Sequence, residues 1–332
     1  MDAETGSGPA DLSGAVDEAV RGVPAPPLRG LVGWYSGYRQ RGLPQTRHRG
    51  LPSPYLTLIL TLDEPLTIAA HPDPRDPPGD YRTLLGGLHT SPAMIEVPGR
   101  QSGVQIALGP LGARALLGLP AGGLAGIDVH ADDVLGPEAR VVHERLREAD
   151  GWAGRFGVLD AWLLDRLGRL DDRAGPPPEV LRAWQLLLAS GGRVRVAALA
   201  DEVGWSGRHL QNRFLAEIGL TPKAAARVIR FDLARRGLAR GVMSGRGKAN
   251  PTGLTPVGPN PAGLNSAGLN SAGLSSAGPG STGVNLAGLA ADFGYADQSH
   301  LDREFTALAG CPPSAWLAEE FRNVQAGHHP PG

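Results

Sequence analysis

The sequence has almost no cysteine and no long hydrophobic segment. Only Cys311 among its 332 residues is a cysteine, so the chain cannot form an internal disulfide or a cysteine-based zinc site. No apolar run approaches the roughly 20 residues that a transmembrane helix needs, and the acidic N-terminus lacks the basic and apolar regions of a signal peptide. We therefore expect a soluble cytoplasmic protein with no membrane partner.

Lysine is also scarce, whereas glycine and proline are abundant. Of the 32 basic residues only Lys223 and Lys248 are lysines, a bias typical of a GC-rich genome. The 48 glycines and 30 prolines approach the content of low-complexity chains. However, 41% hydrophobic residues and a net charge of -1 exclude disorder throughout. The glycines and prolines must therefore be unevenly placed, and the length allows two domains.

Charge is distributed unevenly along the chain. Residues 1–175 carry 17 basic and 22 acidic side chains, residues 190–240 carry 10 and 4, and residues 286–332 carry 2 and 6. A local basic segment in a neutral chain indicates a surface that faces a polyanion, although an ordinary solvated face would give the same pattern.

The N-terminal half predicts an arm followed by a small β-domain. Residues 1–28 are rich in glycine, proline and acid, so we expect a flexible arm. Residues 55–108 alternate short β-rich runs with turn clusters, which predicts a small β-barrel or sandwich. Trailing helices are expected near residues 110–117, 136–148 and 155–170. The triplet Pro176 to Pro178 then predicts a stiff linker.

Residues 245–283 form a low-complexity segment. They hold 10 glycines and 5 prolines in 39 positions, and the units AGLNS, AGLNS and AGLSS repeat every five residues. A period of five matches neither a helix nor a strand, and these units have little to bury. The pattern resembles pentapeptide-repeat solenoids only faintly, so we expect a disordered insert.

Residues 193–218 predict a helix-turn-helix motif. Gly204 permits a left-handed turn, and Ser206 can cap a second helix. Apolar residues share one face of that helix at a spacing of four: Leu210, Phe214 and Ile218. Its other faces carry polar side chains, namely Arg208, His209, Gln211, Asn212 and Arg213. Arginine can read guanine, and glutamine or asparagine can read adenine, so this helix is suited to DNA.

The same pattern recurs in residues 286–308. Gly294 stands at the turn, and Asp297 can cap the second helix. We expect apolar residues to be buried at Leu289, Ala290, Phe293, Leu301 and Phe305. Polar residues then lie outward or on the flanks, at Ser299, His300, Asp302 and Arg303. An ordinary helical hairpin explains one such pattern more easily than two, so the two copies together favour DNA binding. The predicted fold class is α+β, with a β-domain followed by an all-helical domain.

These residues resemble the AraC/XylS family of transcriptional regulators. The first unit matches through Leu199, Ala200, Gly204, Ser206, Leu210, Arg213, Phe214, Gly219, Thr221 and Pro222, with Arg230 and Ala234 on the connecting helix. The second matches through Leu289, Ala290, Gly294, Tyr295, Gln298, Ser299, His300, Leu301, Arg303, Phe305, Gly310, Pro313 and Ser314. The resemblance covers residues 179–324, with residues 325–332 as a tail.

The resemblance implies two recognition helices that enter successive major grooves of promoter DNA. By position, the base-reading candidates are Arg208, Gln211, Asn212, Ser299, Asp302 and Arg303. The flanking or phosphate candidates are Ser206, His209, Arg213, Gln298 and His300. Leu215, Thr306 and Leu317 stand where the family has basic residues, so phosphate contacts are reduced and the acidic second unit is expected to bind DNA weakly.

The resemblance also implies a role for the N-terminal half. Residues 29–175 are more weakly similar to the ligand-sensing or dimerisation domain of some family members. Besides double-stranded DNA, the implied partners are a small-molecule effector in this domain, RNA polymerase and a second copy of the chain, and the protein would associate with the nucleoid when bound.

The sequence holds little competing chemistry. A G-x-G-x-x-G match at Gly278 to Gly283 lies in the repeat without a preceding strand, so we expect no cofactor. Four scattered histidines, His71, His89, His130 and His143, do not predict a metal site. We expect no enzyme activity. Two alternatives remain open: a degenerate regulator or interaction protein with weakened DNA binding, and an enzyme with a catalytic β-domain.

Overall fold

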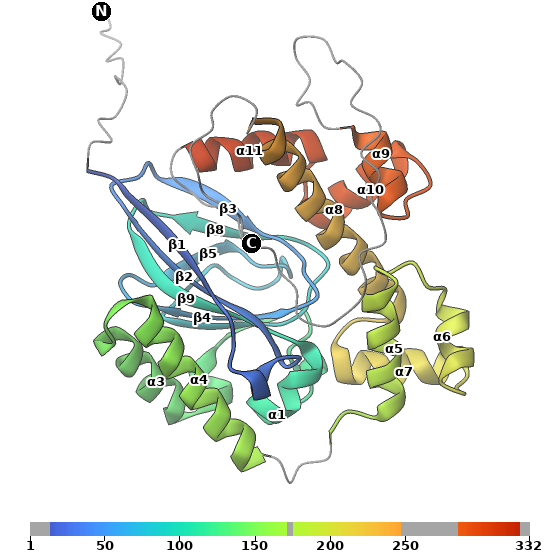
Figure 1. Ribbon diagram of the computed structural model, residues 1–332, viewed down its shortest axis with the longest axis horizontal. Helices are drawn as coiled ribbons and strands as arrows, with labels where there is room; N and C mark the ends of the chain where they lie inside the picture. The colour runs from blue at the N-terminus through green and yellow to red at the C-terminus, as the bar shows by residue number, and fades with distance from the viewer. Residues whose placement is uncertain (1–13, 171–174, 247–284, 326–332) are drawn as a thin grey trace, which may run out of the picture.

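The chain folds into an N-terminal part built on β-sheets and a C-terminal part built only of helices. The computed structural model describes residues 14–170, 175–246 and 285–325 (Figure 1). Its strands all lie between residues 16 and 130, and the described residues after 178 form helices. This arrangement confirms the predicted α+β fold class. Within these ranges, no helix is both long enough and apolar enough to cross a membrane.

Two antiparallel sheets make up the N-terminal part. The six-stranded sheet has the order β1-β2-β9-β4-β7-β10, and the four-stranded sheet has the order β3-β8-β5-β6. The first is formed by β1 (Val16–Gly22), β2 (Val32–Arg41), β9 (Gln101–Leu108), β4 (Leu56–Thr61), β7 (Thr83–Gly86) and β10 (Asp128–His130). The second is formed by β3 (Thr46–Gly50), β8 (Ala93–Val97), β5 (Leu66–Ala70) and β6 (Gly79–Tyr81).

Strand β4 lies at the centre of the core because both of its faces are buried. Leu58 and Leu60 pair with Ile106 and Val104 of β9, and all four side chains are fully buried. Ile59 points to the other face, where it packs with Ile68 of the second sheet. A strand buried on both faces carries a continuous apolar run, and residues 55–62, which include β4, are such a run within the predicted β-domain.

The predicted N-terminal arm overlaps a strand of the six-stranded sheet. Residues 1–13 lie outside the described residues, but β1 pairs along its whole length with β2, and a short 3-10 helix, η1 (Pro26–Leu28), follows. The prediction of a flexible arm over residues 1–28 is therefore wrong for residues 16–28. Backbone pairing with a ten-residue neighbour, rather than side-chain hydrophobicity, holds β1 in place.

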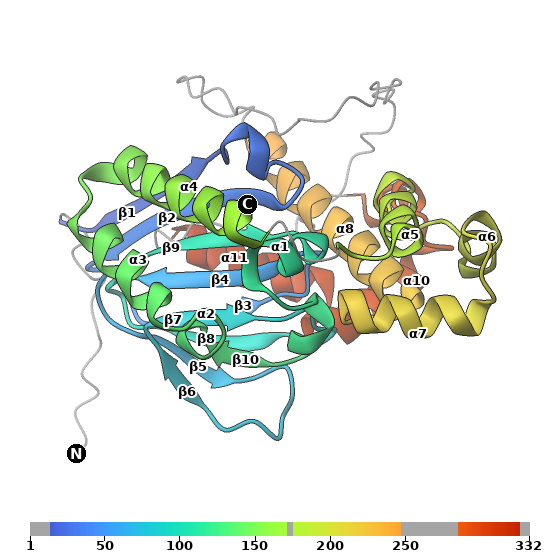
Figure 2. The same ribbon diagram turned by 90° about the horizontal axis from the view of Figure 1, so that it is seen from below.

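Helices cover the sheets on two sides (Figure 2). The helices predicted after residue 110 are confirmed, and α3 and α4 lie along one side of the six-stranded sheet. The N-terminal helices are η2 (Pro110–Gly112), α1 (Ala113–Leu117), η3 (Ala121–Leu124), α2 (Ala131–Leu135), α3 (Pro137–Glu148) and α4 (Gly151–Leu170).

The C-terminal helices form a separate layer beside the sheets. They are α5 (Pro178–Ala189), α6 (Val196–Glu202), α7 (Gly207–Ile218), α8 (Pro222–Arg246), α9 (Leu286–Asp292), α10 (Gln298–Ala309) and α11 (Pro313–Gln325). Pro178 is the first residue of α5 rather than part of a linker, because proline fits the first turn of a helix. The predicted insert, residues 245–283, lies outside the described residues except for its first two, which end α8.

Candidate nucleic-acid interface

The first helix-turn-helix consists of α6 and α7. Gly204 forms the turn with a φ of +69°, and the Ser206 side chain caps α7 by accepting a hydrogen bond from the His209 backbone N–H at 3.2 Å. The apolar residues expected on the inner face, Leu210, Phe214 and Ile218, are fully buried. The local predictions for this unit are therefore confirmed.

The second unit, α9 and α10, repeats the first. Gly294 has a φ of +75°, and Asp297 caps α10 by accepting from the His300 backbone N–H at 2.6 Å. Leu301 and Phe305 are fully buried. Both second helices end at a left-handed glycine, Gly219 in α7 and Gly310 in α10. The two units thus share caps, buried positions and end points.

Most of the predicted DNA-reading side chains are exposed. In α7 these are Arg208, His209, Gln211, Asn212 and Arg213, with Ser206 just before the helix. In α10 the exposed side chains are Gln298, Ser299 and Arg303. Within the described part of the chain, none of the arginines in these two sets forms an ion pair. Their charges therefore face solvent without a carboxylate partner.

Asp302 and His300 are less exposed to solvent than expected. Asp302 is half-buried, and its Oδ1 has no hydrogen-bond partner among the described residues. It lies beside a hollow of about 630 Å³ that Gln298, Arg303 and Pro313 also line. His300 is half-buried, accepts a hydrogen bond from the Ala296 backbone N–H at Nδ1 and packs its ring edge-on against Tyr295.

Sequence reasoning missed this aromatic contact and its equivalent in the first unit. The His209 ring packs edge-on against Trp205 with ring centroids 4.6 Å apart, and the His300 and Tyr295 centroids are 5.4 Å apart. In each unit an aromatic residue in the turn meets a histidine in the first turn of the following helix. The presence of both residue types at matching places was the available signal.

One glutamate of each second helix, Glu217 in α7 and Glu304 in α10, pairs with arginines on the inner side. Glu217 of α7 is buried and accepts two hydrogen bonds from Arg114, at 2.8 and 2.7 Å. Glu304 of α10 accepts from Arg227 at 2.7 Å and from Arg230 at 3.3 Å. Because both carboxylates are neutralised on the inner side, the outer face of α7 carries only positive charge and that of α10 carries Arg303 beside Asp302.

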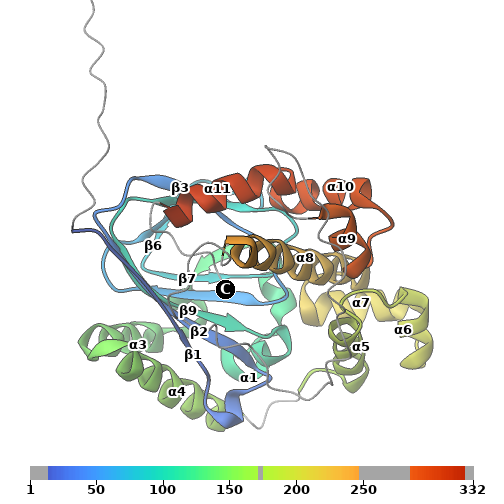
Figure 3. The same cartoon turned by 45° about the horizontal axis from the view of Figure 1, so that its top comes forward.

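Helix α8 joins the two units (Figure 3). It contacts α7 at one end and packs against α9, α10 and α11 further along. Phe231 of α8 packs edge-on against Phe305 of α10, with ring centroids 4.9 Å apart. Arg230 of α8 also donates to the Gly192 carbonyl at 2.8 Å, which ties α8 to the loop before α6. The units are therefore connected through packed side chains as well as through the chain.

The N-terminal part contacts the end of α7. A Cβ on Gly122 of η3 would overlap the backbone carbonyl of Ala216, so only glycine allows this approach. The Arg114 to Glu217 ion pair lies at the same contact, and hydrogen bonding to Glu217 raises the pKa of Arg114. This contact directly joins the β-domain to α7. Nothing in the sequence pattern pointed to it, because its two sides are far apart in the chain.

Cys311 and two of the scattered histidines pack against other groups of the fold. Cys311 is buried, and burial raises the pKa of its thiol. His71 contacts Asp128 through Nδ1 at 2.8 Å, and His89 contacts the Ser91 carbonyl at 2.5 Å. The described residues contain no group of three or more side chains placed to hold a metal ion.

Comparison with known proteins gives structural matches only. No family model and no curated protein matches the chain. An apo form of a ToxT variant from Vibrio cholerae strain SCE256 matches with a TM-score of 0.45 and 9% identity, over 86% of this chain and 96% of that chain. Wild-type ToxT from this strain bound to an unsaturated fatty acid gives 0.45 and 9%, over 85% and 94%. A further Vibrio cholerae ToxT structure gives 0.42 and 12%, over 86% and 97%. Because these values are low, we base no functional conclusion on them.

Proposed function

We propose that this protein is a one-component transcriptional regulator that reads promoter DNA with α7 and α10. The observation that carries the proposal is the duplication of one capped helix-turn-helix unit, with a polar outer face and with one glutamate of each second helix paired on the inner side. Helices with exposed arginine, glutamine and asparagine in their first two turns are suited to the major groove. Gln211 and Asn212 read bases, and Arg208 and Arg213 supply base or phosphate contacts.

The two units differ in the charge that they bring to DNA. The outer face of α7 has Arg208 and Arg213 without carboxylates, whereas Arg303 of α10 lies beside Asp302. Phosphate contacts dominate affinity and its salt dependence. The first unit therefore supplies most of the affinity, and the second adds sequence preference.

The N-terminal part acts as a sensing or pairing domain in this proposal. Its contact with the end of α7 supports this role, because a change in η3 would reach the first recognition helix through Gly122 and the Arg114 to Glu217 pair. A small-molecule effector, RNA polymerase and a second copy of the chain are the further partners that we propose. We propose no enzymatic activity and no cofactor, and a location in the cytoplasm on nucleoid DNA.

Selection from a random DNA library with the full chain tests this function. Binding of the selected site is measured by fluorescence anisotropy over a range of salt concentrations. The paired change Gln211→Ala and Asn212→Ala should lower discrimination against single-base changes by about 1 to 3 kcal/mol per lost contact. The matched control is Gln185→Ala, an exposed position on α5, which should leave discrimination unchanged. Failure to enrich any sequence at low salt contradicts the proposal.

A further inference from the structure

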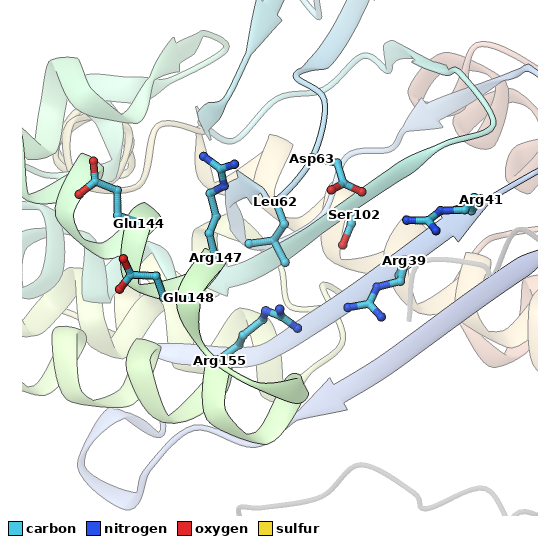
Figure 4. Close-up of a pocket in the computed structure, with 9 residues that line it drawn as sticks. All are labelled: Arg39, Arg41, Leu62, Asp63, Ser102, Glu144, Arg147, Glu148 and Arg155. Atoms are coloured by element: carbon cyan, nitrogen blue, oxygen red, sulfur yellow. The ribbon is translucent and has the colours of Figure 1, made fainter.

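A second polar site lies in the N-terminal part, away from the DNA-reading helices. A pocket of about 490 Å³ opens between the end of β2 and the turn that joins α3 to α4 (Figure 4). Four of its nine lining residues are arginines, which come from three different elements: Arg39 and Arg41 from β2, Arg147 from α3 and Arg155 from α4. The arginines were not recognisable as a group in the sequence, because they are spread over more than a hundred positions.

Within this arginine pocket, the side chain of Arg155 is held in place by its contacts with the protein. Its side chain is nine-tenths buried, with an exposed fraction of 9% for the residue. Nε donates to the Leu146 carbonyl at 3.0 Å, and the guanidinium lies 5.1 Å from the ring centroid of Trp152. Nη1 is buried and has no hydrogen-bond partner within the described part of the chain. A buried donor without a partner is costly, so this guanidinium is held in place but not fully satisfied.

The second guanidinium lies close to the first. In Figure 4 the side chains of Arg39 and Arg155 point toward one another, and Arg39 also lies over the Trp152 ring, 5.7 Å from its centroid. Burial and the nearby Arg39 lower the pKa of Arg155, while Asp150 and Glu18 act in the opposite direction. The nearest carboxylate to Arg39 is that of Glu18, at 4.0 Å. Two like charges therefore lie near one another, and Glu18 approaches Arg39 no nearer than 4.0 Å.

The remaining residues around the pocket complete a polar lining. Ser102 of β9 places a hydroxyl beside the arginines. Asp63 lies next to it, whereas the side chains of Glu144 and Glu148 point away from Arg39 and Arg155 in Figure 4. A planar guanidinium can bind carboxylate or phosphate through two parallel hydrogen bonds, and the volume suits a small molecule.

We propose that the arginine pocket binds the oxyanion group of a small molecule, a phosphate or a carboxylate, between Arg39 and Arg155. The anion relieves the repulsion between the two guanidiniums and supplies acceptors to donors that the protein leaves unpaired. Arg41 and the Ser102 hydroxyl bind further oxygens, and Asp63 favours ligands that carry a donor beside the anion. That this ligand is the effector rests on the regulatory function proposed above; the binding itself does not.

Isothermal titration calorimetry of the full chain tests the binding, with inorganic phosphate and succinate as the probes. We expect saturable binding that Arg39→Gln weakens by about tenfold or more, because a charge-assisted hydrogen bond is lost. Arg39 is a partly exposed strand residue with a side-chain exposure of 43%, so this variant should fold, which thermal unfolding checks. The matched control is Arg75→Gln, which removes one exposed arginine whose ion pair is with Asp73 on its own loop.

The outcomes separate the ligand classes and the two proposals. Tighter binding of phosphate assigns a phosphorylated ligand, and tighter binding of succinate assigns a carboxylate, and either result supports the site. No saturable binding of either probe, or equal affinity in wild type and Arg39→Gln, overturns it. DNA affinity of the same samples is measured separately, so failure of DNA binding with intact anion binding refutes only the regulatory function.

Discussion

At the scale of single residues, two glycines allow α4 to approach the six-stranded sheet closely. A Cβ on Gly37 of β2 would overlap the ring of Trp152, and a Cβ on Gly22 of β1 would lie 2.6 Å from the ring of Phe156. Glycine usually weakens a strand, and it is favoured where another group packs directly on the backbone. Here the rings of α4 fill the space that side chains on the strands would occupy.

Gly37→Ala should therefore destabilise the protein. We expect a loss of about 1 to 3 kcal/mol in the free energy of unfolding, because the new methyl group forces the Trp152 ring out of its position. Gly157→Ala on α4 is the control, since a Cβ there meets nothing within 4 Å. It should stabilise the helix by about 0.5 to 1 kcal/mol. Urea unfolding measures both, and equal effects of the two changes would contradict this account.

At the scale of elements, α10 is held on α8 by a carboxylate between two arginines. Glu304 has a side-chain exposure of 15% and pairs with Arg227 and Arg230, which lie one turn apart on α8. Arg230 also lies 5.8 Å from the ring centroid of Tyr295 in the turn before α10. The position of α10 therefore depends on this group.

Glu304→Gln should loosen α10. We expect a loss of about 1 to 3 kcal/mol, because hydrogen bonds to a charged group are removed from a half-buried site. Glu202→Gln breaks an ion pair with Arg182 in which both side chains are about half exposed, and should cost less than about 1 kcal/mol. Chemical denaturation gives both values. A Glu304→Gln protein as stable as the Glu202→Gln protein would show that the ion pairs do not hold α10.

The ion pairs between α3 and α4 should make the stability of the protein depend on pH in the acid range. Burial acts to raise the pKa of Glu138, but hydrogen bonds from Arg166 and Arg169 outweigh it and leave this pKa below its ordinary value. A lowered pKa in the folded state means that the stabilisation is present above the unfolded pKa of about 4.3 and is lost as the pH falls through the folded value.

The excess stability of wild type over Glu138→Gln should accordingly be constant near neutral pH and shrink below about pH 4. Urea unfolding of both proteins from pH 7 to pH 3 measures this difference. A difference that grows as the pH falls would have the opposite sign and would rule out a lowered pKa at Glu138.

The elements that were predictable from the sequence are those with repeated local signals. Strand β4 is a continuous apolar run, and both helix-turn-helix units carry a cap, a glycine turn and an apolar spacing of four. Strand β2 was missed because its ten residues include two glycines and several polar side chains. Its pairing with β1 and β9, and the rings of α4 above it, hold it in place.

The candidate site was likewise predictable only where its residues are close together in the sequence. The exposed face of α7 could be predicted because helical geometry places Arg208, Gln211 and Asn212 opposite the buried positions. The arginine pocket and the Arg114 to Glu217 pair could not, because each joins residues that are distant in sequence. Long-range contacts of this kind depend on the fold as a whole and leave no local pattern.

At the scale of the whole molecule, the contact between η3 and α7 connects the β-domain to the helix that we propose reads DNA. Glu217→Gln should weaken it, since Arg114 would lose a bidentate carboxylate partner. We expect faster amide hydrogen exchange both in η3 and at the end of α7, with α3 unchanged as the internal control. Exchange that rises in α7 alone would show that the pair stabilises the helix without joining the two parts.

The central claim is that α7 and α10 read DNA together. Hydroxyl-radical footprinting of the full chain on a selected site tests it most directly. We predict two protected segments on one face of the duplex, separated by about one helical turn or roughly 10 base pairs, which appear at the same protein concentration. Arg303→Ala should weaken protection of one segment only. Protection of a single segment, or equal weak protection of every sequence, would contradict the claim.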